Sequence, residues 1–121
     1  MSDFQTIGQQ FCEHYYKTIN ENKADLVQLY TADSMFTYEG DPYKGVENIL
    51  EKLNTLPKIR YDVITFDCQP TTSDGIMCMI GGNLFIDGGD NAVKFAQTFN
   101  LQKGGDFGYY CHNDMFRLNC G

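Results

Sequence analysis

The sequence predicts an α+β fold in which a cone-like, curved antiparallel sheet wraps around a long N-terminal helix. Three observations support this class. Apolar residues recur at helical spacing over residues 4–19, and β-branched and aromatic segments follow one another from residue 60 onward. In addition, 42% of the 121 residues are hydrophobic, which is enough for one core. We therefore expect one domain over residues 1–121, with three helices.

The first half of the chain is predicted to supply the helices. The first helix begins after Asp3, a residue type that caps helices, and ends before the polar segment 20–23. A short second helix is expected around residues 25–30 and a third over 46–53. The apolar stripe of the first helix must lie on the sheet and consists of Phe4, Ile7, Phe11, Tyr15 and Ile19.

The strands are predicted to begin with a small hairpin, in which residues 35–38 pair with Tyr43 and Lys44 across the turn Glu39-Gly40-Asp41-Pro42. Residues 69–74 have the composition of a second turn. Four long strands are expected over residues 61–67, 75–87, 92–102 and 108–118.

The strand over residues 75–87 contains the longest apolar run of the chain. Residues 76–80, IMCMI, place no polar side chain on either face, so both faces need a cover. The helices cover one face, and we expect a second copy of the chain to cover the other. Gly81 and Gly82 predict a bend or bulge within the strand, and Asp87 at its end is expected in solvent.

Charge and cysteine content exclude several functions. The net charge of −7 disfavours binding to nucleic acid and anionic membranes and favours basic partners. Residues 1–10 have no basic region followed by an apolar one, so we expect neither a secretory signal nor membrane insertion. The five cysteines lack metal-type spacing and are odd in number, which predicts free, mostly buried thiols in a reducing compartment.

The sequence offers few groups for catalysis. His14 and His112 are the only imidazoles, and no phosphate loop, metal motif or nucleophile triad is present. We interpret His14 as a hydrogen-bonded helix residue and not as a general base. Asp114 lies between aromatic residues in a strand, where a carboxylate needs a partner, and Arg117 or Tyr16 is the expected one. We therefore expect no enzymatic activity and no cofactor.

Five motifs in order carry a family resemblance. They are FxxIGxxFxxHYY in the first helix, the YEG turn with Gly45 beyond it, EKLxxLP, the QP pair at Gln69-Pro70 and the closing NDMFRLN. Together they span Phe4 to Asn119 and resemble the nuclear transport factor 2 family. The resemblance implies a homodimeric, cone-shaped carrier that takes the GDP form of the GTPase Ran through the nuclear pore. It also implies contact with FxFG nucleoporin repeats, and a location in the cytoplasm, the nucleus and the nuclear envelope at the pore.

The resemblance also implies a binding site for Ran. Glu39 stands at the family's turn glutamate and Asp87 at the first acid of its acidic loop. Gly89 occupies the position of the second acid, and Asp90 takes that role if the loop is one residue longer. We expect an apolar pocket below these acids, lined by Tyr38, Leu56 and Phe116.

Two further surfaces follow from the resemblance and from strand alternation. Phe4 replaces the family's tryptophan for nucleoporin binding, while its helical position also fits a residue that pins the helix start. Met79 and Met115 point away from the helices if Ile80 and Phe116 point inward, which places both methionines at the dimer interface.

Two alternative functions stay open at this stage. The same cone fold is found in ketosteroid isomerases and scytalone dehydratases, and such a cavity would hold Tyr15, Tyr16, Tyr38 and Asp114. The closing NDMFRL favours the transport family over these enzymes. The second alternative is a dimeric scaffold module of the same fold, which the acids placed at the cavity mouth disfavour.

Overall fold

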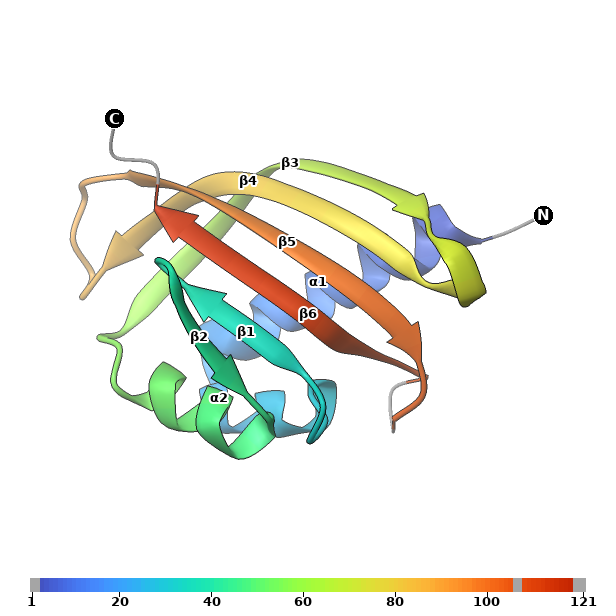
Figure 1. Ribbon diagram of the computed structural model, residues 1–121. Coiled ribbons are helices and arrows are strands. Elements are labelled where there is room, and N and C mark those ends of the chain that lie inside the picture. The colour runs from blue at the N-terminus through green and yellow to red at the C-terminus, as the bar shows by residue number, and fades with distance from the viewer. Residues whose placement is uncertain (1–2, 106–107, 119–121) are drawn as a thin grey trace.

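A long helix, α1, crosses one face of a curved six-stranded sheet in the computed structural model (Figure 1), which describes residues 3–105 and 108–118. A shorter helix, α2, and a 3-10 helix, η1, lie beyond one edge of that sheet (Figure 1). The elements in chain order are α1 (Phe4–Glu21), η1 (Lys23–Leu29), β1 (Met35–Tyr38), β2 (Asp41–Lys44), α2 (Val46–Asn54), β3 (Ile59–Pro70), η2 (Thr72–Asp74), β4 (Ile76–Ile86), β5 (Val93–Lys103) and β6 (Tyr109–Leu118). The expected fold class is confirmed.

The strand order across the sheet is β2-β1-β6-β5-β4-β3, with β2 and β3 at the edges. One pairing differs from the expected antiparallel sheet, because β1 runs parallel to β6, with Phe36 opposite Asp114. Parallel neighbours need a long crossover connection, and here the chain from β2 to β5 supplies it. The other four pairings are antiparallel.

The bend expected near Gly81 and Gly82 takes the form of a bulge on the facing strand. The register of β3 against β4 shifts between Val63 and Thr65, so Ile64 is an extra residue. A side chain at Gly82 would collide with the backbone carbonyl of Asp62. Glycine therefore allows β3 to approach closely where the sheet bends.

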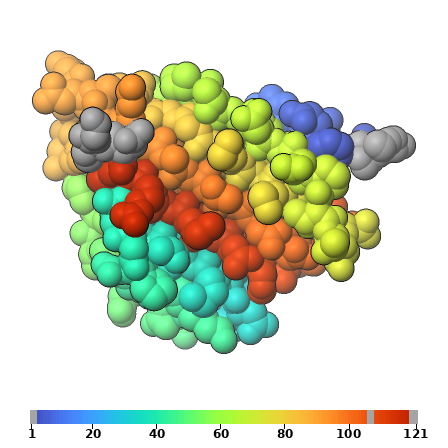
Figure 2. Space-filling view, turned by 45° about the horizontal axis from the view of Figure 1, so that its top comes forward, coloured from blue at the N-terminus to red at the C-terminus, as the bar shows by residue number. Residues whose placement is uncertain are grey.

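The apolar run of β4 alternates between a buried and an exposed face. Ile76, Cys78 and Ile80 are buried in the core shared with α1, while Met77 and Met79 are 45% and 58% exposed. In the space-filling view the strands form one broad face, with α1 visible only at its rim (Figure 2). The chain thus covers one face of this run itself and leaves the other open.

Both ends of α1 differ in detail from the expectation. Asp3 precedes the helix without a side-chain capping bond, so the predicted cap is wrong, and its backbone carbonyl accepts from Ile7 N at 2.8 Å instead. After α1 the chain forms η1, a 3-10 helix, because Asn22 extends the backbone and its side chain caps Ala24 N at 3.2 Å. Within the described part of the chain, no helix has the length and apolar composition to cross a membrane.

The turn predicted over residues 69–74 is also shorter than expected. Strand β3 continues through Pro70, and only Thr72–Asp74 form a 3-10 turn. Proline is tolerated there because β3 is an edge strand with no further neighbour to receive its missing N–H.

Candidate functional site

Three connections meet at the end of the molecule where β4 and β6 finish: the β1–β2 turn, the α2–β3 connection and the β4–β5 loop (Figure 1). The β4–β5 loop and the α2–β3 connection are joined directly, because Asp87 N donates to the Lys58 carbonyl at 2.7 Å. The β1–β2 turn is tied to the end of β6 in the same way, through Glu39 N and the Phe116 carbonyl at 3.0 Å. The predicted acids Glu39, Asp87 and Asp90 therefore belong to one end of the fold.

Glu39 is held in a fixed position on the β1–β2 turn. Its backbone is left-handed, with φ of 53°, and the following Gly40 also has a positive φ. Its Oε1 accepts the Leu118 N–H at 2.6 Å, a short, charge-assisted bond. One carboxylate oxygen is thus used to orient the group, and because the residue is exposed the other can accept from a cation outside the molecule.

Aromatic rings fill the interior directly below this turn. Tyr38 stacks on Phe116, with ring centroids 5.0 Å apart, and Phe116 stacks on Phe95 at 5.6 Å. Tyr61 packs edge-on against Phe116 at 6.4 Å. The Lys52 ammonium lies 5.1 Å from the Tyr38 ring centroid, close enough for a cation–π contact. Phe116 is buried in the core, whereas Tyr38 is half-buried.

Leu56 lines an open cleft of about 370 Å³ between the end of α1 and the α2–β3 connection. The cleft reaches Tyr61, the same ring that packs against Phe116, but its lining includes neither Tyr38 nor Phe116. Lys23 Nζ closes one side by donating to the Leu53 and Leu56 carbonyls, at 3.0 and 3.3 Å. The structure thus brings the three expected pocket residues near Tyr61 without merging them into one cavity.

The two loop acids are exposed and have different surroundings. Asp87 has a left-handed backbone, with φ of 53°, at the point where β4 ends. Asp90 lines a cleft of about 420 Å³ that also includes Lys58 and Arg60. Arg60 is already engaged, since it forms a 2.8 Å ion pair with Asp62. Basic side chains near Asp90 weaken the negative potential around it, so Asp90 is the less favourable of the two loop acids for a basic partner.

Asp114 lies inside the fold, and neither of its expected partners touches it. Its Oδ2 accepts from Tyr30 at 2.6 Å and from Tyr15 at 3.5 Å, and its Oδ1 accepts from Gln97 at 2.8 Å. Tyr16 joins the network one step away, donating to Gln97 Oε1 at 2.6 Å. The expected direct partners, Arg117 and Tyr16, are therefore wrong, since Arg117 is on the exposed face of β6 and Tyr16 bonds to the intervening amide.

Burial dominates the chemistry of this carboxyl group. Asp114 is 1% exposed, and desolvation raises its pKa to about 7, while the bonds from Tyr30, Gln97 and Tyr15 act in the opposite direction. Burial likewise raises the pKa values of Tyr15 and Tyr30 well above the ordinary value. The three protein donors thus occupy both oxygens of this buried carboxyl group.

The remaining expected surfaces lie elsewhere on the fold. Phe4 opens α1 at the opposite end and packs partly against the core. Met79 and Met115 are 58% and 55% exposed on the sheet face away from α1, which confirms the predicted alternation. Within the described residues, no group of three His, Cys, Asp or Glu side chains is arranged to hold a metal ion.

Several contributors to this site were not predicted. Lys52 and Tyr61 come from α2 and β3, far in sequence from the turn they support. The bond from Leu118 to Glu39 depends on a backbone group, which no residue pattern reveals. A signal for Lys52 was present, because it belongs to the EKLxxLP motif at the end of α2.

The fold and the site together define the class of protein: an α+β cone with acidic residues beside stacked aromatic rings at one end and an open sheet face that carries exposed methionines. A family model described as the nuclear transport factor 2 (NTF2) domain matches residues 7–118. The chain is 42% identical over 121 residues to a nuclear transport factor 2 of Emericella nidulans, covering 98% of this chain and 97% of that protein. The chain belongs to the nuclear transport factor 2 family.

Solved structures agree with this assignment. Nuclear transport factor 2 from Cryptosporidium parvum superposes with a TM-score of 0.90 at 39% identity, covering 96% of this chain and 94% of that one. A chain of the C. albicans Mtr2–Mex67 M domain complex shares the fold, with a TM-score of 0.83 at 18% identity and coverage of 96% and 94%. Family membership supports a role in nuclear transport, as a carrier.

Proposed function

We propose that this chain is a nuclear import carrier that binds the GDP form of Ran and the FxFG repeats of nucleoporins. The observation that carries the proposal is the oriented carboxylate of Glu39, bound to Leu118 N–H above the stacked rings of Tyr38 and Phe116. A fixed anion beside aromatic surface suits a partner that presents a cation next to an aromatic side chain. Glu39 is the principal contact, with Asp87 and Asp90 as further acids of the rim.

The apolar part of the Ran site is proposed at the Leu56 cleft. Leu56 and Tyr61 face a cleft large enough for one aromatic side chain of a partner, and Tyr61 connects it to Phe116. Burying an aromatic anchor in such a cleft supplies most of the affinity of many interfaces. Leu56→Asp is expected to abolish Ran binding while the oligomeric state stays unchanged.

The protein is proposed to act as a homodimer joined through the sheet. Met77, Met79 and Met115 are large, exposed and apolar on one face, as expected for a surface that a second copy covers. The nucleoporin contact is proposed at Phe4, on the first turn of α1. Movement between cytoplasm and nucleus, with attachment at the pore, would follow from binding to Ran and to nucleoporins.

Retention on immobilised Ran loaded with GDP or with a GTP analogue tests the proposal. The expected result is retention on the GDP form and none on the GTP form, weakening as salt rises because exposed charges are screened. A folded dimer that binds neither form would favour the scaffold alternative. The enzyme alternative has less support, because Asp114 is enclosed by its three donors.

A further inference from the structure

Two thiols border one glycine of α1, Gly8, and a third thiol, that of Cys12, bonds to one of them, Cys78. Cys12 comes from α1, Cys68 from the edge strand β3 and Cys78 from β4. A methyl group on Gly8 would lie 3.2 Å from Cys68 Sγ and 3.3 Å from Cys78 Sγ. Both sulfur atoms therefore border the same small space, which exists because residue 8 has no side chain.

The backbone places two of these thiols directly opposite each other. Cys68 and Cys78 are register partners in the antiparallel pair of β3 and β4. Opposed residues in such pairs have Cα atoms about 4.5 or 5.5 Å apart, and both values fall within the range of about 4.4 to 6.8 Å found in disulfides. Since both side chains point toward Gly8, they also lie on the same face of the sheet.

The two thiols differ in access and in acidity. Cys68 is half-buried on an edge strand, whereas Cys78 is 0% exposed. Burial raises the pKa of Cys68, while a hydrogen bond from Cys12 lowers the pKa of Cys78. An oxidant in solution therefore reaches Cys68 first, and Cys78 is the better thiolate to complete a second step.

We infer that Cys68 and Cys78 form a reversible disulfide, a redox modification site under the first turn of α1. With oxidised glutathione, Cys68 loses its proton and attacks one sulfur, which breaks the S–S bond and releases one glutathione thiolate. The Cys78 thiolate then attacks Cys68 Sγ and releases the second. The two thiolates take up the two protons from the protein, so the protein is oxidised by two electrons and the glutathione disulfide is reduced.

The disulfide changes contacts of α1. In the reduced protein the single S–H of Cys68 has two acceptors in reach, the Phe4 carbonyl at 3.7 Å and Gln5 Oε1 at 3.6 Å. A disulfide sulfur has no hydrogen, so neither hydrogen bond can form when the pair is oxidised. Oxidation therefore loosens the turn that carries Phe4, and backbone amides there should exchange hydrogen several-fold faster.

Mass spectrometry of the full chain treated with oxidised glutathione tests this inference. A protease that cleaves before aspartate places each of the five cysteines on a different peptide, with Cys68 on residues 67–73 and Cys78 on residues 74–86. The expected product has lost two hydrogens and links these two peptides. A chain that stays reduced, that keeps glutathione on Cys68 or that links any other pair overturns the inference.

Serine variants test whether Cys68 reacts before Cys78. In Cys78→Ser the reaction should stop with one glutathione on Cys68. The folded Cys68→Ser variant should show no linkage and no glutathione on Cys78. Cys68 is only half-buried, so its variant tests the pair even if Cys78→Ser folds poorly. Cys12→Ala removes the hydrogen bond that lowers the Cys78 pKa, so the same linkage should form more slowly than in the parent. No Cys68–Cys78 linkage at all in Cys12→Ala, or unchanged hydrogen exchange in the first turn of α1 in the oxidised parent, contradicts the assignment.

Discussion

At the scale of single residues, two carboxylates have opposite environments: Asp114 is buried among hydrogen-bond donors, whereas Glu39 is exposed on the β1–β2 turn. Asp114 on β6 is satisfied by two hydroxyls and an amide, from Tyr15 of α1, Tyr30 just after η1 and Gln97 of β5. Such a network is stable only if every member keeps its partner. The Glu39 carboxylate, in contrast, is oriented by a single backbone N–H and stays accessible to solvent.

The raised pKa of Asp114, about 7, predicts how stability depends on pH. The folded state holds a proton that the unfolded state releases near pH 4, so the unfolding free energy falls as pH rises from about 4 to 7. The slope from this group is about 1.4 kcal/mol per pH unit at most. Asp114→Asn removes the titration, so denaturant unfolding at pH 5, 6, 7 and 8 should give a parent-minus-variant difference that falls and then levels off. A difference that is flat with pH would contradict the assignment.

The two loop acids are expected to differ in their effect on Ran binding. Asp87→Asn deletes a charge without clash and should weaken binding by a few-fold, as is usual for exposed pairs. Asp90 shares its cleft with Lys58 and Arg60, so Asp90→Asn should have the smaller effect. Association rates measured at low and high salt check this order, and a larger loss in Asp90→Asn would make that residue the second acid of the rim.

At the scale of elements, close approach between β3 and β4 controls how the sheet curves. The bulge at Ile64 lies opposite two glycines, and only one of them is tightly confined by backbone. A side chain at Gly82 meets the Asp62 carbonyl, whereas one at Gly81 first meets the hydroxyl of Thr65, which can rotate. The curvature of the sheet thus depends more on Gly82 than on Gly81.

Gly82→Ala is accordingly expected to destabilise the fold by about 2 kcal/mol or more, because β3 must shift away from β4. Gly81→Ala is the matched control and should cost clearly less. Denaturant midpoints of both variants measure the difference. Equal midpoints would show that the bend does not depend on backbone contact at Gly82.

At the scale of the whole molecule, the cone leaves one face of its sheet without a cover. Three methionines on that face have roughly half of their surface in solvent, and the strands that carry them, β4 and β6, are central to the sheet. The described residues supply no further element for that face, since both α-helices among them lie on other sides (Figure 1). The open face is therefore the surface that the proposed dimer uses.

Met115→Glu is expected to shift the protein toward monomer, because dimer formation would bury a carboxylate against an apolar partner surface. Val27 in η1 is similarly exposed, at 46%, and Val27→Glu serves as the control that should stay dimeric. Light scattering over a range of protein concentrations measures the oligomeric state of both variants. An unchanged dimer in Met115→Glu would remove this face from the interface.

Much of this architecture could be predicted from the sequence, because apolar spacing determined the helices and strands to within a few residues. The parallel pairing of β1 with β6 could not, since local pattern does not specify which distant strand becomes a neighbour. The partners of Asp114 were missed for the same reason, as Tyr30 and Gln97 are distant in sequence. The positions of Glu39 and Asp87 followed from the family resemblance, whereas the bond that orients Glu39 appears only in the structure.

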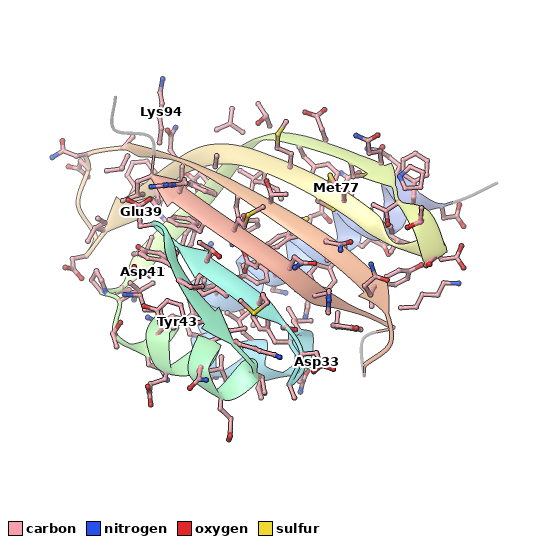
Figure 3. All side chains as sticks on the ribbon, in the orientation of Figure 1. Asp33, Glu39, Asp41, Tyr43, Met77 and Lys94 are labelled. Atoms are coloured by element: carbon pink, nitrogen blue, oxygen red, sulfur yellow. The ribbon has the colours of Figure 1, made fainter. Side chains whose placement is uncertain are left out.

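The affinity of the full-length protein for GDP-loaded Ran, with and without the Glu39 charge, tests the account most directly. Glu39→Gln keeps an oxygen for the Leu118 bond and should weaken binding, while Glu39→Lys reverses the charge and should cost about 2 to 5 kcal/mol, enough to lose detectable binding. Asp33→Lys makes the same charge change just before β1, at the other end of that strand from Glu39, and should bind like the parent (Figure 3). If Glu39→Lys remains a dimer and binds GDP-loaded Ran as tightly as the parent at low salt, the proposed acidic rim is not the Ran site.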